Sequence, residues 1–566
     1  MKKRWVYPSP SSPEKVNELG TALNINPFLT TILIQRGIDS FDKAKAFFRP
    51  SLDLLHDPFL LTDMDKAVER IHQAVINQEK ILVYGDYDVD GTTSVALMYR
   101  YLKTFYTHCE YYIPDRYKEG YGVSEAGILW AEENGYTLII ALDLGIKASG
   151  MIALANEKKI DFIICDHHLP DDTIPLAVAV LDPKRKDCDY PFKELSGCGL
   201  GFKLVQAYSK KYGNENDAFQ FLDLVVVSIA SDIVPISGEN RILAYHGMKQ
   251  LNENPSAGLK ALKEISGIKS EMDISMVVFT LGPRINAAGR VAHARGAVDL
   301  LIAPTMEDAL NLAESLNLSN DLRREYDSNI TEEALMMIAA QENVATLRST
   351  LLFKETWHKG VIGIVASRCI EKYYRPTIVL TQSNGLLTGS ARSVQGFDLY
   401  QAIEACGDLL EKFGGHKFAA GLSLVPENLI EFKKRFEAVV SATITDDQLT
   451  PSVNIDCLTN FDALTWSFHK VLKQMAPFGP ENQKPVFEAR NVFVQNSLTA
   501  FKDKHLRFLA GQKDNKAIFQ AVGFDQMEYY EQIASGEPFN MAFTLEENTF
   551  NGETTLQLRI RDLLFV

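Results

Sequence analysis

A stretch near residue 80 constrains most strongly what this chain can fold into. Residues 81–94 read ILVYGDYDVDGTTS, and their apolar and aromatic start runs directly into Asp86, Asp88 and Asp90. An apolar run that ends in acids predicts a buried strand whose tip emerges at a site. Carboxylates at alternate positions are costly to keep ionised together unless a cation lies among them. Hard divalent cations such as Mg²⁺ and Mn²⁺ prefer oxygen ligands of this kind.

Two other loop motifs share part of this pattern. Asp86, Asp88, Asp90 and Gly91 match the opening of an EF-hand, but the twelfth position of that loop, which requires Glu, is Leu97. A Walker phosphate-binding loop requires Gly-Lys followed by Ser or Thr, and no such sequence follows the glycine. A solvated acidic turn stays an open alternative for this stretch taken alone.

Length and composition are those of an ordinary globular protein with several domains. The 566 residues suffice for three or four domains, with 46% hydrophobic and 23% charged residues. The net charge of −15 argues against a protein coated in positive charge, but a local basic groove could still bind nucleic acid. Seven scattered cysteines without a C-x-x-C pair favour reduced, buried thiols.

The sequence gives no sign of export or of membrane insertion. No apolar signal core follows the basic residues at the start, and the longest apolar run, near 222–230, is too short to cross a bilayer. We therefore expect a cytoplasmic protein without membrane contact.

Strand and helix patterns alternate from Lys80 to about Pro235, which predicts a parallel sheet with helices on both faces. The expected strands cover 81–84, 137–142, 161–165, 177–181 and 221–230, and a helix is expected over 94–106. Open parallel sheets place their sites beyond the carboxyl ends of the strands. Four of these runs would bring polar side chains to one edge: Asp86, Asp88 and Asp90; Asp143; Asp166, His167 and His168; and Asp232. This convergence favours a metal centre over a chance cluster of acids.

The residue types at this edge suit phosphodiester chemistry. Two divalent ions about 3.5–4 Å apart can clamp the attacking and leaving oxygens of a phosphodiester, which requires a bridging carboxylate and terminal ligands for each ion. A single imidazole suits Mn²⁺ better than Mg²⁺. A second imidazole could hydrogen-bond a ligand or the substrate phosphate.

The motifs at these strand ends resemble those of a known superfamily. GDYDVDGTTS, ALDLGI, CDHH and ASDIVP look like the four ordered motifs of the DHH phosphoesterases. More narrowly, the chain resembles the RecJ family of single-stranded-DNA-specific 5′→3′ exonucleases over nearly its whole length. That likeness includes LGPRINAAGR at 281–290, WHKGVIGIVASR at 357–368, GSARSVQGFDL at 389–399, FGGHKFAAGL at 413–422 and MAPFGPENQKPVF at 475–487. One position differs: the superfamily often has His four residues before the first Asp of the D-x-D pair, and here that residue is Tyr84.

The resemblance implies an enzyme that uses two Mn²⁺ or Mg²⁺ ions to degrade single-stranded DNA 5′→3′ to 5′-mononucleotides, in DNA repair and recombination. It implies that Asp88 and Asp143 hold one ion with help from Asp86. Asp90, Asp143, His167 and Asp232 would hold the other, which makes Asp143 the bridge. His168 would lie beside the substrate phosphate. Asp88, Asp90, Asp143, His167, His168 and Asp232 are thus the expected catalytic residues.

Further residues are expected to bind the substrate. Arg284 and Arg290 flank Asn286 and a run of small residues, a combination that suits a close approach to phosphate. The resemblance implies that Arg284, Ser390 and Arg392 hold the terminal 5′ phosphate. His416 would line the same cleft, between the first domain and a DHH-associated domain, near the scissile phosphate.

The last part of the chain is rich in strands. Expected strands at 486–493, 505–510, 517–524, 539–545 and 554–559 suggest an OB-fold barrel. Aromatic and basic residues mix near 501–507, as they do in proteins that bind single strands.

The predicted architecture is α/β with a C-terminal barrel. Its parts are an N-terminal segment packed on the first domain (1–60), a parallel-sheet DHH domain (61–305), a long linking helix (306–345), a smaller α/β DHH-associated domain (346–445) and an OB-fold domain (446–566). Within the first part, short helices are expected at 28–37 and 41–48 after an irregular start. At the beginning of the DHH domain, a further helix at 64–77 leads to the first strand.

Two other functions stay open on the sequence alone. One is a DHH phosphodiesterase for short oligonucleotides or cyclic dinucleotides, against which the length and the barrel speak. The other is a DNA-binding scaffold with a relic site, against which the full set of expected ligands speaks. Besides single-stranded DNA, the resemblance implies a single-stranded-DNA-binding protein and a RecQ-type helicase as partners.

Overall fold

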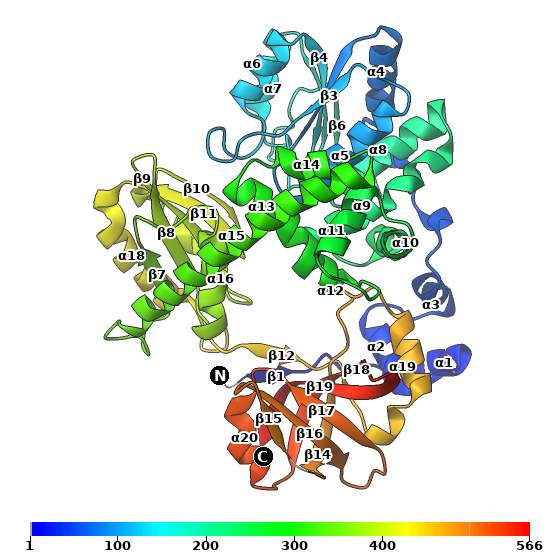
Figure 1. Ribbon diagram of the computed structural model, residues 1–566, viewed down its shortest axis with the longest axis vertical. Helices are drawn as coiled ribbons and strands as arrows, with labels where there is room; N and C mark the ends of the chain where they lie inside the picture. Colours follow the sequence, from blue (N-terminus) through cyan, green and yellow to red (C-terminus); the bar gives the residue numbers. More distant parts are fainter. Residues whose placement is uncertain (1–2, 497, 566) are drawn as a thin grey trace. The chain divides into compact units, whose positions relative to one another are not determined.

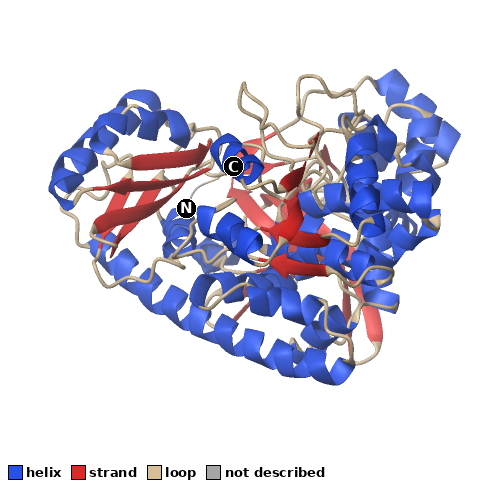
Figure 2. Ribbon diagram, turned by 90° about the horizontal axis from the view of Figure 1, so that it is seen from above, coloured by secondary structure: helices blue, strands red, loops and turns tan. Residues whose placement is uncertain are grey.

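The chain folds into two compact units, each built from separate stretches of sequence. The computed structural model describes residues 3–496 and 498–565 (Figure 1). One unit, here the parallel-sheet unit, comprises Arg36–Asp321 and Leu472–Lys484. The other, here the barrel unit, comprises the residues up to Gln35, Leu322–Val471 and Pro485–Val566. In Figure 2, strands in red and helices in blue show the mixed composition of both.

The parallel-sheet unit is built on a sheet in which all strands run in the same direction. The strand order is β3-β2-β4-β5-β6. The strands are β2 (Lys80–Gly85), β3 (Cys109–Tyr112), β4 (Tyr136–Leu142), β5 (Asp161–Cys165) and β6 (Ala179–Leu181). The parallel sheet expected from the sequence is confirmed, and β3 is an additional edge strand that the sequence did not lead us to expect.

Helices cover both faces of this sheet because both faces of each strand are apolar. Along β2, Ile81 and Val83 belong to one hydrophobic core, and Leu82 and Tyr84 to another on the opposite face. Side chains alternate between faces along a strand, so a fully apolar strand needs a layer on each side. Helices α4 (Met64–Ile76), α5 (Val89–Lys103) and α8 (Gly197–Tyr212) lie on one side, and α6 (Glu125–Glu133) and α7 (Ser149–Glu157) on the other (Figure 1).

One of the expected strands is wrong. Residues 221–230 were expected to form a strand, but the structure has a helix there, α9 (Leu222–Ser231). Leu222 to Ala230 are buried without exception. A helix that is buried on all sides gives the same unbroken apolar run as a buried strand, so periodicity could not separate the two. Helix α10 (Gly238–Glu253) follows and packs on α9.

The chain then continues through helices α11 (Ala257–Ile265), α12 (Ile274–Met276), α13 (Gly282–Val291) and α14 (Arg295–Leu301). The long helix expected at 309–341 is present as α15 (Met306–Ala339). Its first turns contribute Ala309 and Ala313 to the core of the parallel-sheet unit. Its last turns contribute Ala334 and Ile338 to a core of the barrel unit.

The barrel unit contains a smaller α/β sheet. Its strand order is β10-β11-β9-β8-β7. The strands are β7 (Thr350–Phe353), β8 (Thr377–Ser383), β9 (Leu386–Arg392), β10 (Lys412–His416) and β11 (Ala419–Leu424). The helices that lie between and after these strands in the sequence are α16 (Ile362–Lys372), α17 (Leu399–Glu404) and α18 (Leu429–Thr443).

The C-terminal strands form a second sheet, with the order β13-β14-β18-β19-β17-β16-β15. An additional pairing of β14 with β16 closes this sheet into a barrel. The strands are β13 (Cys457–Leu458), β14 (Phe487–Val494), β15 (Thr499–Phe501), β16 (His505–Gln512), β17 (Ile518–Gly523), β18 (Phe539–Phe550) and β19 (Glu553–Phe565). Each expected barrel strand is present, and a small barrel of this kind is OB-like, as expected.

The N-terminal segment divides between the two units. β1 (Arg4–Val6) pairs in parallel with β12 (Ser452–Asn454), and Gln35 donates a hydrogen bond to the backbone of Asp456. The expected irregular start contains a helix, α1 (Pro13–Leu23), which begins with Pro13 at its first position. Helix α2 (Pro27–Gln35) also belongs to the barrel unit, whereas α3 (Phe41–Phe48) belongs to the parallel-sheet unit. The N-terminal segment expected over residues 1–60 is therefore divided between the two units at Arg36, and the predicted domain boundaries stay a prediction.

Among the described residues, no helix combines the length and the apolar character that a bilayer crossing requires.

A buried ion pair joins α8, α10 and the segment before α4. Lys203 Nζ lies 2.7 Å from Glu239 Oε1, and both side chains are almost fully buried. Lys203 also donates to the carbonyl of His56, whose N–H donates to Glu239 Oε1. Tyr190 donates to the other oxygen of Glu239 at 2.7 Å. Hydrogen bonds thus compensate both buried charges, which makes each partner costly to lose alone.

The first prediction concerns this pair. Lys203→Met should lower the free energy of unfolding by about 3–5 kcal/mol, because Glu239 would stay buried without its counter-charge. Urea unfolding followed by fluorescence measures the change. Lys210→Met is the matched control, because Lys210 is on the same helix but its side chain is 39% exposed in its pair with Asp57. That control should cost less than about 1 kcal/mol. Equal losses for the two variants would contradict the prediction.

Candidate metal centre

The register of the parallel sheet brings the expected acids to one level. Gly85 of β2, Leu142 of β4, Cys165 of β5 and Leu181 of β6 form one row across the sheet. Each of these residues is followed by an aspartate: Asp86, Asp143, Asp166 and Asp182. The four carboxyl groups therefore begin at the same edge, next to the start of α5.

The acids of the first motif lie along the passage from β2 into α5. Asp86 follows the strand, Asp88 is the N-cap of α5 and accepts a hydrogen bond from the N–H of Gly91 at 3.1 Å, and Asp90 lies in the first helical turn. The helix thus starts at Val89 and not at Ser94 as expected, because Asp88 caps it. Gly91 is required here, since a Cβ at this position would lie 2.4 Å from the carbonyl oxygen of Asp86.

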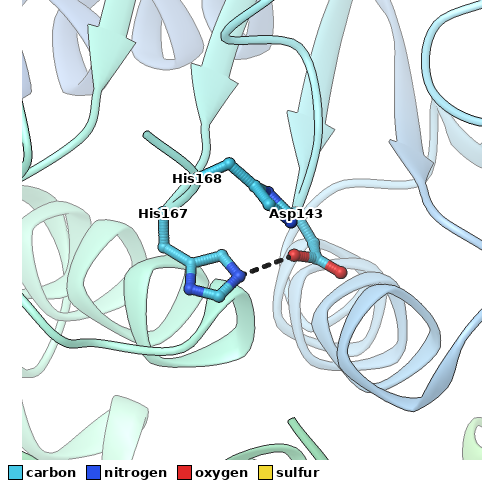
Figure 3. A group of neighbouring side chains, drawn as sticks. All are labelled: Asp143, His167 and His168. Atoms are coloured by element: carbon cyan, nitrogen blue, oxygen red, sulfur yellow. Dashed lines mark ion pairs between the residues drawn. The ribbon is translucent and has the colours of Figure 1, made fainter. Parts of the chain in front are cut away.

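Three overlapping groups of side chains could each hold a cation. They are Asp86, Asp88 and Asp143; Asp90, His167 and Asp232; and Asp143, His167 and His168. In each group the ligand atoms lie within 4.8 Å of one another. Nε2 of His167 faces the acids, at 3.2 Å from Asp143 Oδ1, 3.6 Å from Asp232 Oδ2 and 3.7 Å from Asp90 Oδ2. Figure 3 shows His167 directed at Asp143, with His168 above them. The structure brings every expected ligand into one cluster, and their roles as ligands stay a prediction.

Asp232 reaches this cluster from a helix. It is the C-cap of α9, and its N–H donates to the carbonyl of Ser228 at 2.9 Å. Ile233, the next residue, has φ of 60°, which turns the chain sharply away. Asp143 has φ of 63°, so two of the candidate ligands lie at or beside left-handed backbone positions. Non-glycine residues adopt this conformation at a cost, and it is enriched at functional sites.

Burial and mutual repulsion act on the acids of this cluster. Burial, followed by the charge of Asp90, raises the pKa of Asp143 well above its ordinary value. Burial and the charge of Asp88 do the same for the pKa of Asp86. Burial and the charge of Asp90 raise the pKa of Asp232 to about 8. These carboxylates therefore require added positive charge to be ionised together.

The unsatisfied atoms of the cluster fit a divalent cation. Among the described residues, none makes a hydrogen bond to Asp86 Oδ1, to Asp143 Oδ1 or to either ring nitrogen of His167. These atoms are buried, and buried polar atoms without partners are rare unless they have another ligand. Two carboxylate oxygens and an imidazole nitrogen are a donor set that Mn²⁺ accepts, and the carboxylates alone suit Mg²⁺.

His168 is held differently from His167. Its Nδ1 lies 2.7 Å from Asp166 Oδ1, and its backbone N–H donates to the same oxygen at 3.1 Å. Asp166 Oδ2 accepts a hydrogen bond from the N–H of Ile146 at 2.9 Å, which fixes the carboxylate. Burial opposes the charged form of His168, but the hydrogen bond to Asp166 outweighs it and raises the pKa of His168 to about 9. The hydrogen bond to Asp166 thus favours the protonated form of His168, and its Nε2 lies 3.4 Å from the hydroxyl of Tyr121.

Tyr84, the position that differs from the superfamily pattern, does not point at the acids. Its ring is fully buried in the core on the α6 side of the sheet, and its hydroxyl lies 3.2 Å from Ser124 Oγ. The structure thus gives Tyr84 a packing role.

Arg284, Asn286 and Arg290 lie on one short helix, α13. The sequence indicated a run of small residues here without predicting its secondary structure, and in the structure these residues allow the helix to pack closely. A Cβ at Gly289 would lie 2.8 Å from the carbonyl oxygen of Tyr87, which stands between Asp86 and Asp88. Arg284 donates to Asn317 Oδ1 at 3.0 Å and to the carbonyl of Thr280 at 2.8 Å. Helix α13 therefore adjoins the first acidic motif.

Ser390, Arg392 and His416 lie in the smaller sheet of the barrel unit. Arg392 donates to Ser390 Oγ at 3.0 Å. Arg392 of β9 pairs with Ala419 of β11, and Ala419 pairs with His416 of β10. Residues paired across neighbouring strands share a face of the sheet, so Arg392 and His416 lie on the same face.

Two features near the expected residues were not anticipated from the sequence. Gly363 in the first turn of α16 packs on the Ser390–Arg392 pair, because a Cβ there would lie 2.8 Å from Ser390 Oγ and from an Arg392 nitrogen. Asp182 is buried with one oxygen bonded to the N–H of Lys184, and burial raises its pKa to about 7. Gly363 lies within the motif at 357–368 that carries the family likeness, but nothing in that motif indicated its contact with Ser390 and Arg392. The strand expected at 177–181 placed Asp182 at the end of a strand, but the sequence indicated no function for it.

Three protein families match separate parts of the chain. Residues 80–229 match the N-terminal domain of the DHH family, 341–442 match the DHHA1 domain, and 455–562 match the RecJ OB domain.

Curated relatives match over nearly the whole chain. The single-stranded-DNA-specific exonuclease RecJ of Bacillus subtilis is 35% identical over 565 residues, which cover 99% of this chain and 71% of that protein. The protein of the same name from Escherichia coli is 30% identical, with coverage of 95% and 96%. Among solved structures, RecJ of Thermus thermophilus in complex with Mn²⁺ has a TM-score of 0.86 at 25% identity and covers all of this chain and 80% of its own. The Mg²⁺ complex of RecJ from the same organism has a TM-score of 0.80.

The second prediction tests the fit to a cation. Asp143→Asn should leave the metal-free unfolding temperature unchanged or raise it, because one member of a crowded group of acids loses its charge. The stabilisation by Mn²⁺ should be lost, whereas the wild type should gain about 2.7 kcal/mol at a Mn²⁺ concentration of 100 times Kd. Thermal unfolding with and without Mn²⁺ measures both effects. Asp65→Asn, at an exposed position of α4, is the control and should respond as the wild type does. Full stabilisation of Asp143→Asn by Mn²⁺ would rule out this centre.

Proposed function

Because this chain belongs to the RecJ family of single-stranded-DNA-specific exonucleases, we propose that it degrades single-stranded DNA 5′→3′ and releases 5′-mononucleotides, in DNA repair and recombination. The observation that carries this proposal is the buried cluster of aspartates and an imidazole at the carboxyl edge of the parallel sheet. Several of its buried atoms have no hydrogen-bond partner in the part of the chain that the structure describes. Such a cluster suits a hydrolase that works through divalent cations.

The proposed metal ligands divide into two sets. Asp88 and Asp143, with Asp86, would hold one ion; Asp90, Asp143, His167 and Asp232 would hold the other. Bound Mn²⁺ or Mg²⁺ supplies positive charge that activates water for attack and offsets the charge that develops on the phosphodiester. The overlap of the candidate groups at Asp143 supports its place as the bridging ligand.

His168 would act on the phosphate itself. As a cation held by Asp166, it can donate a hydrogen bond from Nε2 to a non-bridging phosphate oxygen, and Asp166 keeps the ring from turning. A donor fixed in advance loses little freedom when the transition state forms, which favours the transition state over the bound substrate.

Arg284, Asn286, Arg290, Ser390, Arg392 and His416 would bind the DNA backbone. Arg392 and Ser390 together offer guanidinium and hydroxyl donors, which suit a terminal phosphate. Contacts to phosphates carry no sequence information, so sequence preference should be weak. We also propose a cytoplasmic location, and a single-stranded-DNA-binding protein and a RecQ-type helicase as partners, on the family relationship alone.

The third prediction tests activity and polarity together. With Mn²⁺ or Mg²⁺, the wild type should shorten a single strand from its 5′ end, so a 5′ label appears as mononucleotide before a 3′ label does. Asp143→Ala should reduce the rate by at least about 1,000-fold while the protein stays folded, because both proposed ions lose a ligand. Gels of 5′- and 3′-labelled strands measure the rates, and circular dichroism checks the fold.

Two results would contradict this proposal. Faster cleavage of a dinucleotide than of a long strand would favour a phosphodiesterase for short substrates. Undiminished activity of Asp143→Ala would remove Asp143 from the centre.

The fourth prediction tests the proposed 5′-phosphate contacts of Ser390 and Arg392. Gly363→Ala should displace both side chains and reduce kcat/KM on 5′-phosphorylated strands by about 10-fold or more, the loss expected for a hydrogen bond to a charged group. Strands with a 5′ hydroxyl should be affected less. Gly150→Ala is the control, because Gly150 is also the second residue of a helix and a Cβ there meets no atom of the described residues within 4 Å. Equal losses on both kinds of strand would contradict these contacts.

A further inference from the structure

The first turn of α8 contacts two of the candidate metal ligands. It is preceded by Ser196 as N-cap, and its sequence from Ser196 is SGCG. The N–H of Gly197 donates to Asp90 Oδ2 at 2.7 Å, and the N–H of Cys198 donates to Asp90 Oδ1 at 2.8 Å. The first N–H groups of a helix have no partner within the helix. Here both oxygens of a carboxylate from α5 accept from them.

Ser228 of α9 adds a third hydrogen bond to the same carboxylate. Its Oγ lies 2.6 Å from Asp90 Oδ1 and 2.6 Å from Ser196 Oγ. A carboxylate oxygen accepts, so the hydroxyl of Ser228 donates to Asp90. Ser196 in turn accepts from the N–H of Gly199 at 3.1 Å.

Ser228 also contacts a second acid of the same group. Its carbonyl accepts the N–H of Asp232 at 2.9 Å. One buried residue therefore contacts the carboxylate of Asp90 and the backbone of Asp232, and these two acids lie with His167 in one candidate cation position.

Gly197 contacts Asp143 through its lack of a side chain. A Cβ at Gly197 would lie 2.6 Å from Asp143 Cβ and 2.8 Å from Asp143 Oδ1. Contacts this short require one of the groups to move, and the carboxylate of Asp143 is the group in the way. The same turn thus holds Asp90 by its N–H groups and limits the position of Asp143 by its Cα.

We infer that the first turn of α8, which begins at Gly197, sets the spacing of Asp90 and Asp143 together with Ser228. This spacing then determines the affinity for divalent cations. Gly197 and Ser228 are positioning residues, since they act through the carboxylates. The inference rests on the proposed function only in treating these acids as ligands. Partners that orient metal ligands typically change metal affinity by about 10–100-fold when they are replaced.

The experiment compares two glycines of the same helix in the full-length protein without DNA. Gly197→Ala places a methyl group against Asp143, whereas Gly201→Ala places it at an ordinary 3.5 Å from Leu142. Gly201→Ala, inside the helix, should favour the helix by about 0.5–1 kcal/mol, whereas the clash at position 197 opposes any such gain, so circular dichroism checks the fold of both variants. Binding of Mn²⁺ is measured from the paramagnetic resonance signal of the free ion.

Gly197→Ala should bind Mn²⁺ about 10–100-fold more weakly than the wild type, and Gly201→Ala should bind it as the wild type does. Exonuclease activity of Gly197→Ala should recover as Mn²⁺ is raised, which a general folding defect would not show. Equal Mn²⁺ affinity for the two variants would overturn the inference.

A second pair of variants covers the case in which Gly197→Ala does not fold. Ser228→Ala removes a donor to Asp90, and Ser209→Ala removes an equally buried hydroxyl of α8 that donates to Tyr101 at 2.8 Å. Ser228→Ala should weaken Mn²⁺ binding, whereas Ser209→Ala should not. Unchanged Mn²⁺ binding by Ser228→Ala would overturn the inference. A wild type that binds no Mn²⁺ would overturn the proposed metal centre as well. A wild type that binds Mn²⁺, with Ser228→Ala and Gly197→Ala binding it equally well, would overturn this inference and leave the proposed function standing.

Discussion

The structure depends on the burial of several carboxyl groups in one small volume, which the chain makes tolerable in two ways. Asp90 and Asp166 have protein donors for their oxygens: helix N–H groups and a hydroxyl for Asp90, and backbone N–H groups and an imidazole for Asp166. Asp86 and Asp143 each have a buried oxygen for which none of the described residues is a hydrogen-bond donor. The protein's own donors satisfy the oxygens of Asp90 and Asp166, whereas Asp86 and Asp143 require a bound cation to compensate their charge. The fold thus holds these carboxyl groups in place without supplying enough positive charge to balance them.

The acids of this centre could be located from the sequence because of a property of parallel sheets. Parallel strands in register end at one edge, so the residue after each apolar run must reach that edge whatever the loops do. The row Gly85, Leu142, Cys165 and Leu181 shows this directly, since each is followed by an aspartate. Asp232 was placed correctly by a wrong argument, since its expected strand is the helix α9. An apolar element that ends at the core boundary delivers its next residue there, whether it is a strand or a helix.

The features that the sequence did not indicate are contacts between distant segments. The N–H of Gly197 and the carboxylate of Asp90 are 107 residues apart, and nothing in SGCG separates a turn that binds a carboxylate from an ordinary helix start. The pairing of β1 with β12 joins residues near 4 and 452, and three-residue strands carry too little pattern to be recognised. Arg392 and His416 share a face of their sheet only because of the register that Ala419 sets between them. Local periodicity predicts elements, whereas such contacts depend on how the elements are packed.

The geometry of the metal centre also limits which features of the substrate it can recognise. Its candidate ligands are strand-end and helix-end acids with an imidazole, and a centre of this kind recognises a phosphodiester, not the length of the chain that the phosphate belongs to. Selection of a long single strand over a dinucleotide must therefore arise from contacts beyond the acids. The residues available for this are cationic and hydroxyl groups that lie on other elements, such as Arg284 on α13 and the Ser390–Arg392 pair on β9. Reaction type and substrate selection are thus separate properties of this chain: the first follows from one edge of one sheet, and the second requires groups that no single motif contains.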